Sequence, residues 1–132
     1  MKLQADRMEG LNAISRHGVA GVIVNGTEHR SSVIVPWQGR VQAWPVDDFS
    51  ALSEAHFELL AALGPELVIF GSGSRIRFPK PAWLGPLMAR RIGIETMDTA
   101  AASRTYNVLL AEGRTVVVAL LFEGAGASPA SG

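Results

Sequence analysis

A glycine-containing loop, Gly71-Ser72-Gly73-Ser74-Arg75, has the residue types best suited to hold a ligand. Two glycines allow neighbouring backbone N–H groups to converge on an anion, and the arginine adds a charge-assisted donor for a carboxylate or phosphate. Ile76 stands where a dinucleotide-binding fingerprint would have its third glycine, and the Gly-Lys-Ser/Thr ending of a phosphate loop is missing. The sequence therefore predicts either a small-anion site or a tight structural turn, and not a nucleotide site.

Asp98, Thr99 and Arg104 are further candidates for binding a ligand. Asp98 and Thr99 stand where a predicted strand meets a predicted helix, so either side chain can cap that helix by accepting from its first free N–H groups. Capping is the simpler interpretation, and recognition of a ligand together with Arg75 is the alternative. The residues that we predict to bind a ligand or a partner are Gly71, Ser72, Gly73, Arg75, Asp98, Thr99 and Arg104.

The residue types argue against thiol, metal and serine-hydrolase chemistry. The chain has no cysteine, and its three histidines, His17, His29 and His56, lack the spacing of metal ligands. Gly71-Ser72-Gly73 matches half of a nucleophile elbow, and no histidine follows it in the chain. We predict no catalytic residue, no metal and no cofactor, while an enzymatic use of the Gly71–Arg75 loop stays open as an alternative.

The chain has 132 residues, of which 48% are hydrophobic, and its 12 basic residues balance 12 acidic ones. This length and composition are typical of one folded domain. A net charge of zero disfavours nucleic acid as a partner, because non-specific binding depends on cations that displace phosphate counterions. The charge is uneven, however: the stretch from Leu67 to Ile94 has five cations and no acid, which indicates a locally basic face or an ordinary solvated surface.

The hydrophobic pattern predicts strands followed by alternating strands and helices. The first half predicts strands over 19–24, 32–35 and 40–44, with a hairpin turn at Asn25-Gly26 and a loop longer than two residues, and then a helix over 53–63. The second half predicts a strand over 67–70, a helix over 83–91, a strand over 92–97, a helix over 99–112 and a strand over 115–122. We thus predict an α/β domain over 1–123, in which an N-terminal β-hairpin region precedes a βαβαβ unit.

The two ends of the chain and its longest apolar run indicate where in the cell the protein is found. Residues 1–10 lack the apolar core of a secretory signal and contain Asp6 and Glu9, whereas mitochondrial transit peptides are poor in acids. The longest apolar run, Val116 to Phe122, is too short to cross a membrane. We expect a cytoplasmic protein without a transmembrane segment, ending in a disordered tail over 124–132 made of glycine, alanine, serine and proline.

Three segments together resemble a widespread domain-of-unknown-function family: residues 66–75, Phe78-Pro79 and residues 93–109. That family includes mitochondrial respiratory complex I assembly factor three and an adipogenesis-associated cytoplasmic protein. Its characteristic positions fall here on Gly71, Gly73, Arg75, Phe78, Pro79, Asp98, Thr99, Arg104, Tyr106 and Asn107.

The resemblance implies a compact three-layer fold with a mixed β-sheet, no known cofactor and no established catalytic activity. It also implies a function through protein partners, because family members with a known role act as assembly or interaction proteins. We therefore expect a non-catalytic binding or assembly module. The alternative is a small-molecule or anion-binding protein, or an enzyme, that uses the Gly71–Arg75 loop.

Overall fold

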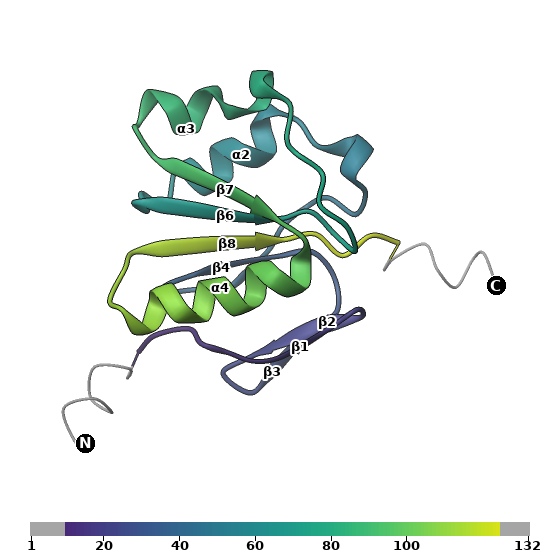
Figure 1. Cartoon of the computed structure of the whole chain (residues 1–132), viewed down its shortest axis with the longest axis vertical. Helices are drawn as coiled ribbons and strands as arrows, with labels where there is room; N and C mark the ends of the chain where they lie inside the picture. The colour runs from purple at the N-terminus through teal and green to yellow at the C-terminus, as the bar shows by residue number, and fades with distance from the viewer. Residues whose placement is uncertain (1–9, 125–132) are drawn as a thin grey trace.

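A five-stranded mixed β-sheet forms the centre of the domain (Figure 1). The structure, a computed structural model, describes residues 10–124. The predicted tail therefore lies outside the described residues except for Gly124. The strands follow the order β5-β4-β8-β6-β7, and their bounds are β4 Val33–Pro36, β5 Gln42–Ala43, β6 Leu67–Gly71, β7 Gly93–Met97 and β8 Val116–Leu120.

β8 joins the two halves of this sheet. It pairs antiparallel with β4 on one side and parallel with β6 on the other, and β6 pairs parallel with β7. Every residue of β8 is buried, because both faces of the strand are covered. Such a strand reads as a continuous apolar run, and this is why residues 115–122 were recognisable in the sequence.

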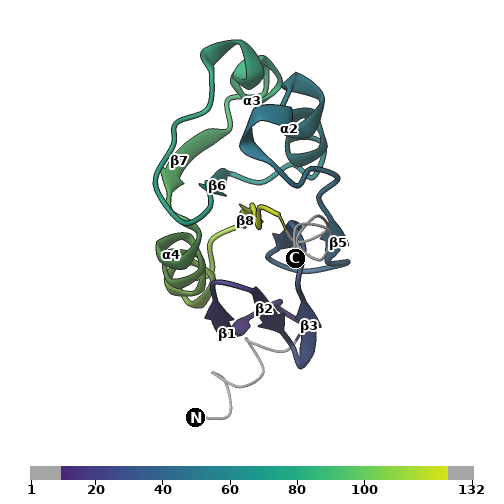
Figure 2. The same cartoon turned by 90° about the vertical axis from the view of Figure 1, so that its right-hand side faces the viewer.

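Helices cover the two faces of the sheet, so that the fold has three layers, as predicted (Figure 2). One face carries two 3-10 turns and two short α-helices: η1 Phe49–Ala51, α2 Glu54–Ala61, η2 Pro81–Leu84 and α3 Gly85–Ala89. The other face carries α4 (Thr99–Ala111) together with a three-stranded antiparallel sheet: β1 Ile14–Gly18, β2 Gly21–Val24 and β3 Thr27–His29.

The side chains of β8 alternate between the two cores on either side of the sheet. Val117 and Ala119 pack in the core that contains Phe57 of α2. Val116 and Val118 pack in the opposite core, with Tyr106 of α4. The alternation follows from the pleat of a strand, which sends successive side chains to opposite faces.

The N-terminal hairpin differs from its prediction. The Asn25-Gly26 turn is present, with both φ angles positive (49° and 87°), but it is a two-residue turn between β2 and the polar strand β3. The predicted strand over 19–24 was wrong at its start, because Val19 lies in a turn and β2 begins at Gly21. The structure adds β1, whose exposed polar residues gave no apolar pattern.

The helix predicted over 83–91 begins and ends two residues earlier than expected, and only its second part is α-helical. It consists of η2 followed by α3, and Pro86 falls at the start of the regular helix. Proline is tolerated there because the first turn of a helix has no internal acceptor for that N–H. The helix predicted over 53–63 ends earlier, at Ala61, and Gly64 then turns the chain with a φ of 68°.

Candidate functional site

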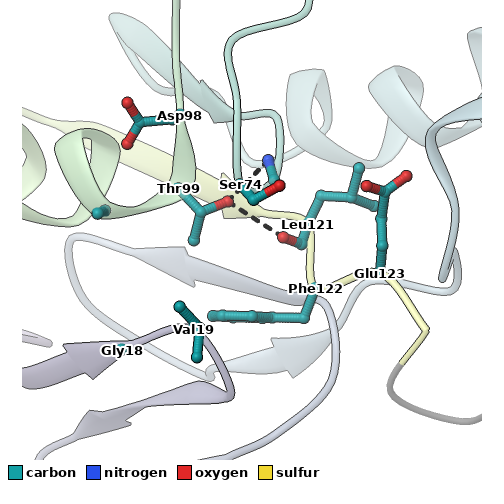
Figure 3. Close-up of a pocket in the computed structure, with 10 residues that line it drawn as sticks. Gly18, Val19, Ser74, Asp98, Thr99, Leu121, Phe122 and Glu123 are labelled. Atoms are coloured by element: carbon teal, nitrogen blue, oxygen red, sulfur yellow. Dashed lines mark hydrogen bonds between the residues drawn. The ribbon is translucent and has the colours of Figure 1, made fainter. Parts of the chain in front are cut away.

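A cavity of about 300 Å³ opens where the parallel strands end (Figure 3). Three segments meet there: the loop after β6, the start of α4, and the residues that follow β8, with the β1–β2 turn closing the fourth side. The carboxyl ends of parallel strands are a usual place for ligands in α/β sheets. The lining residues are Gly18, Val19, Gly73, Ser74, Asp98, Thr99, Ala100, Leu121, Phe122 and Glu123.

Thr99 connects three of these segments by hydrogen bonds. Its hydroxyl accepts from the N–H of Gly73 at 2.9 Å and donates to the carbonyl of Leu121 at 3.1 Å (Figure 3). Its own N–H donates to the carbonyl of Gly73 at 2.8 Å. Thr99 is 7% exposed, so these hydrogen bonds lie in the interior and fix the loop against the start of α4.

Ser72 organises the turn that follows β6. Its N–H donates to the carbonyl of Met97 at 2.8 Å, and its fully buried hydroxyl accepts from the N–H of Arg77 at 2.8 Å. The hydroxyl also donates to the carbonyl of Arg75 at 2.8 Å. The N–H groups of Ser72 and Gly73 are therefore engaged inside the fold, which leaves the predicted loop with fewer free donors for an anion.

Gly71 allows the close approach of β6 to α4. A Cβ atom at this position would lie 2.9 Å from Cδ2 of Leu120 and 3.1 Å from both Cβ of Ala102 and Cα of Thr99. Two of these neighbours are a fixed backbone atom and a short side chain, which have little freedom to move. The glycine therefore has a packing role at the base of the cavity.

Asp98 caps α4, which is the simpler of the two roles that the sequence allowed. Its carboxylate accepts from the N–H of Ala101 at 2.9 Å. Asp98 is also one of the residues that line the cavity. Capping and contact with a bound molecule are compatible, because a carboxylate has two oxygens.

The structure does not bring the two predicted arginines into the cavity. The residues Arg75 and Arg104 are exposed, and neither lines the cavity. A third arginine, Arg77, contacts a lining residue: its guanidinium forms an ion pair with Glu123, donates to the carbonyl of Ser72 at 2.8 Å and lies 4.7 Å from the ring centre of Phe49.

Six residues of this site outside the predicted loop were missed in the sequence: Gly18, Val19, Ala100, Leu121, Phe122 and Glu123. The last three follow β8 directly, so the rule that ligands bind beyond the carboxyl ends of parallel strands could have identified them. Val19 carried no such signal, because its turn reaches the cavity only through the packing of the small sheet against the large one.

Neither a metal centre nor a membrane span is found in the part of the chain that the structure describes. Among residues 10–124 no three histidine, aspartate or glutamate side chains gather as metal ligands would. No helix within the same residues is long and apolar enough to cross a bilayer.

The chain is similar to a curated protein and to solved structures. It is 33% identical over 110 residues to NADH dehydrogenase [ubiquinone] 1 alpha subcomplex assembly factor 3 of Bos taurus, covering 82% of this chain and 59% of that protein. The chain thus spans about three-fifths of that relative's length.

Two Bordetella structures share the fold. The crystal structure of a Bordetella parapertussis protein matches with a TM-score of 0.80 and 38% identity, covering 85% of this chain and 96% of that one. The solution structure of a Bordetella pertussis protein, described as a Mth938-like domain, matches with a TM-score of 0.80 and 30% identity over 92% of each chain.

A family profile matches residues 14–121, from β1 to the residue after β8. The match includes the loop after β6, the start of α4 and Tyr106-Asn107, which are the segments that carried the resemblance in the sequence. The family resemblance is therefore confirmed: the chain belongs to the family described as protein of unknown function (DUF498/DUF598).

Proposed function

We propose that this protein is a non-catalytic binding or assembly module that acts on a protein partner in the cytoplasm. The observation that carries the proposal is the cavity beyond β8, whose walls are mostly apolar and whose outer edge is Val19, a side chain that is 98% exposed. An exposed apolar side chain beside an apolar cavity extends it into one continuous apolar patch, and such a patch is typical of a surface that a partner covers.

The shape of this site suits the insertion of a partner's side chain. Phe122 provides an apolar wall beside Val19, and Thr99 engages the N–H of Gly73 and the carbonyl of Leu121. A cavity of about 300 Å³ can take one or two large side chains, which is how energetic anchors dock in protein interfaces. The bovine relative is named as an assembly factor, which supports a partner of this kind.

The test is site-specific photo-crosslinking in the source organism. A crosslinking amino acid at Val19 should capture a defined protein, and capture should be lost when Ala100, an exposed residue that lines the cavity, is replaced by glutamate in the same chain. A crosslinker at Val108, an exposed valine on α4 outside the cavity, is the matched control. Equal products from both positions would contradict the proposal.

The second candidate function is binding of a small molecule or anion by the Gly71–Arg75 loop. The exposed Arg75 favours it, because within residues 10–124 its guanidinium has no ion-pair partner. Chemical-shift mapping with phosphate tests it: the amides of Gly71, Gly73 and Ser74 should move at millimolar phosphate, and Arg75→Ala should abolish the shifts while leaving the melting temperature unchanged. Unmoved amides would exclude this function.

A further inference from the structure

The irregular segment between β6 and η2, residues 74–80, leaves apolar side chains in water. Phe78 is 70% exposed and Ile76 is 51% exposed, although both are large and hydrophobic. The cavity does not explain them, because neither residue lines it. We call this segment, Ser74 to Lys80, the amphipathic loop.

Cations alternate with these apolar side chains. Arg75 and Lys80 are exposed and, among the described residues, form no ion pair, whereas Arg77 turns inward to Glu123. Lys80 extends along Trp83, with its ammonium 5.8 Å from the ring centre. The exposed part of the loop thus carries two free positive charges beside two apolar side chains and contains no acid.

A second apolar tip lies at the same end of the molecule. The β1–β2 turn that carries Val19 and the loop after β6 both lie on the right-hand side of Figure 1, the side that faces the viewer in Figure 2. Val19 and Ser74, the first residue of the amphipathic loop, line one cavity, so the two turns are neighbours.

We propose that the amphipathic loop is a docking element for an anionic lipid surface. Phe78 and Ile76 would enter the boundary between headgroups and acyl chains, while Arg75 and Lys80 contact lipid phosphates. Clusters of basic side chains are attracted to anionic headgroups, and their long aliphatic stems allow the charge to stay in the polar layer. The inference does not depend on the protein partner proposed above.

The form of the loop favours a lipid surface over a protein surface. Phe78 and Ile76 extend from a segment without helix or strand. A protein partner needs a matching pocket for each of these tips. A bilayer accepts apolar tips in any arrangement, provided that they lie at one end of the molecule and that cations lie beside them.

The experiment is co-sedimentation of the full chain with vesicles. Vesicles of phosphatidylglycerol and phosphatidylcholine in equal amounts should bind the protein, and vesicles of phosphatidylcholine alone should not. Raising the salt from about 0.1 M to 0.5 M should weaken binding several-fold, because salt screens the attraction between exposed charges. No sedimentation with the anionic vesicles at the lower salt would overturn the proposal.

Two pairs of variants test which residues are responsible. Phe78→Ser should lower binding roughly ten-fold, because the variant no longer gains the free energy of moving an aromatic side chain from water into the lipid. Met88→Ser, which alters a side chain that is 71% exposed on α3, should leave binding unchanged. Arg75→Glu with Lys80→Glu should abolish binding, whereas Arg40→Glu with Arg104→Glu, an equal change of net charge at exposed positions, should have a much smaller effect.

Insertion of the loop has its own readout. In Phe78→Trp, the new indole should shift its emission to shorter wavelength on adding anionic vesicles, and Met88→Trp should show no shift. All variants should keep the melting temperature of the parent, because every altered side chain is exposed. If inorganic phosphate at millimolar concentration displaces the vesicles while Phe78→Ser binds like the parent, the loop is a simple anion site and the proposal fails.

Discussion

The side-chain amide of Asn107 forms two hydrogen bonds with the backbone of Ile14, 93 residues earlier in the chain. Its oxygen accepts from the N–H of Ile14 at 2.9 Å, and its nitrogen donates to the carbonyl of Ile14 at 2.6 Å. The amide thus occupies the position that a neighbouring strand would take at the edge of β1. A residue of α4 that the resemblance singled out therefore holds the small sheet in place and does not line the cavity.

This contact predicts that Asn107→Ala will loosen the N-terminal hairpin. Two partly buried backbone groups would lose their partners, which should lower the free energy of unfolding by about 1–3 kcal/mol. Urea unfolding measures the change, and Val108→Ala, at an exposed neighbour, is the control. An Asn107→Ala variant as stable as the parent would show that the hairpin is held by its apolar contacts alone.

Tyr106, the single tyrosine of the chain, predicts a pH dependence at alkaline pH. Its hydroxyl donates toward the carbonyls of Asn12 at 2.7 Å and Pro36 at 3.0 Å, and burial raises the pKa of this phenol above its ordinary value. Above about pH 10 the unfolded chain loses the proton that the folded chain retains, so stability should fall by up to about 1.4 kcal/mol per pH unit.

The measurement is urea unfolding between pH 9 and pH 11, with Tyr106→Phe as the comparison. The phenylalanine variant should be less stable at neutral pH, because two buried carbonyls lose a donor, and its stability should fall less steeply as pH rises. Parallel curves for the two proteins would show that Tyr106 ionises while the protein remains folded.

Gly71→Ala should destabilise the domain by about 1–3 kcal/mol, the usual cost of forcing an extra methyl group into a packed core. The new Cβ would lie 2.9 Å from Cδ2 of Leu120 and 3.1 Å from Cα of Thr99. Gly18→Ala is the control, since its Cβ would meet no atom within 4 Å. Thermal unfolding compares the two, and equal melting temperatures would mean that β6 and α4 can move apart without cost.

Thr99→Val tests whether the start of α4 is held by the threonine hydroxyl. The substitution keeps the shape and leaves the N–H of Gly73 and the carbonyl of Leu121 without this partner, so unfolding should become easier by about 1–3 kcal/mol. Thr99→Ser retains the hydroxyl and should lose less. Hydrogen exchange of the Gly73 amide gives a local readout: it should accelerate in Thr99→Val and stay slow in Thr99→Ser.

The sequence predicted best the elements whose pattern is local. The runs Leu67–Phe70 and Val116–Phe122 are continuously apolar, so β6 and β8 were identified together with the helix between β7 and β8. The strand β1 was missed because its residues are mostly polar and exposed. Its extended conformation is stabilised by pairing with β2 and by the hydrogen bonds to Asn107.

The sequence singled out three of the residues that line the cavity but not the hydrogen bonds between them. Gly73, Asp98 and Thr99 do line one cavity. That the N–H of Gly73 is occupied could not be inferred, because its acceptor on Thr99 lies 26 residues later and the pairing depends on how β6 and α4 pack. In the same way, no local pattern distinguishes the inward Arg77 from the exposed Arg75, because the two differ only in their contacts in the fold.

The central place of β8 has a consequence for biosynthesis. β4 and β6 are not neighbours in the sheet, and each pairs with β8, the last strand of the described chain. During translation β4 and β6 therefore have no strand to pair with between them. The backbone groups along their facing edges stay unpaired until residues 116–120 have left the ribosome. The sheet can close only after β8 is made, so closure of the sheet is expected to wait for residues 116–120, with the unpaired edges of β4 and β6 accessible to chaperones until then.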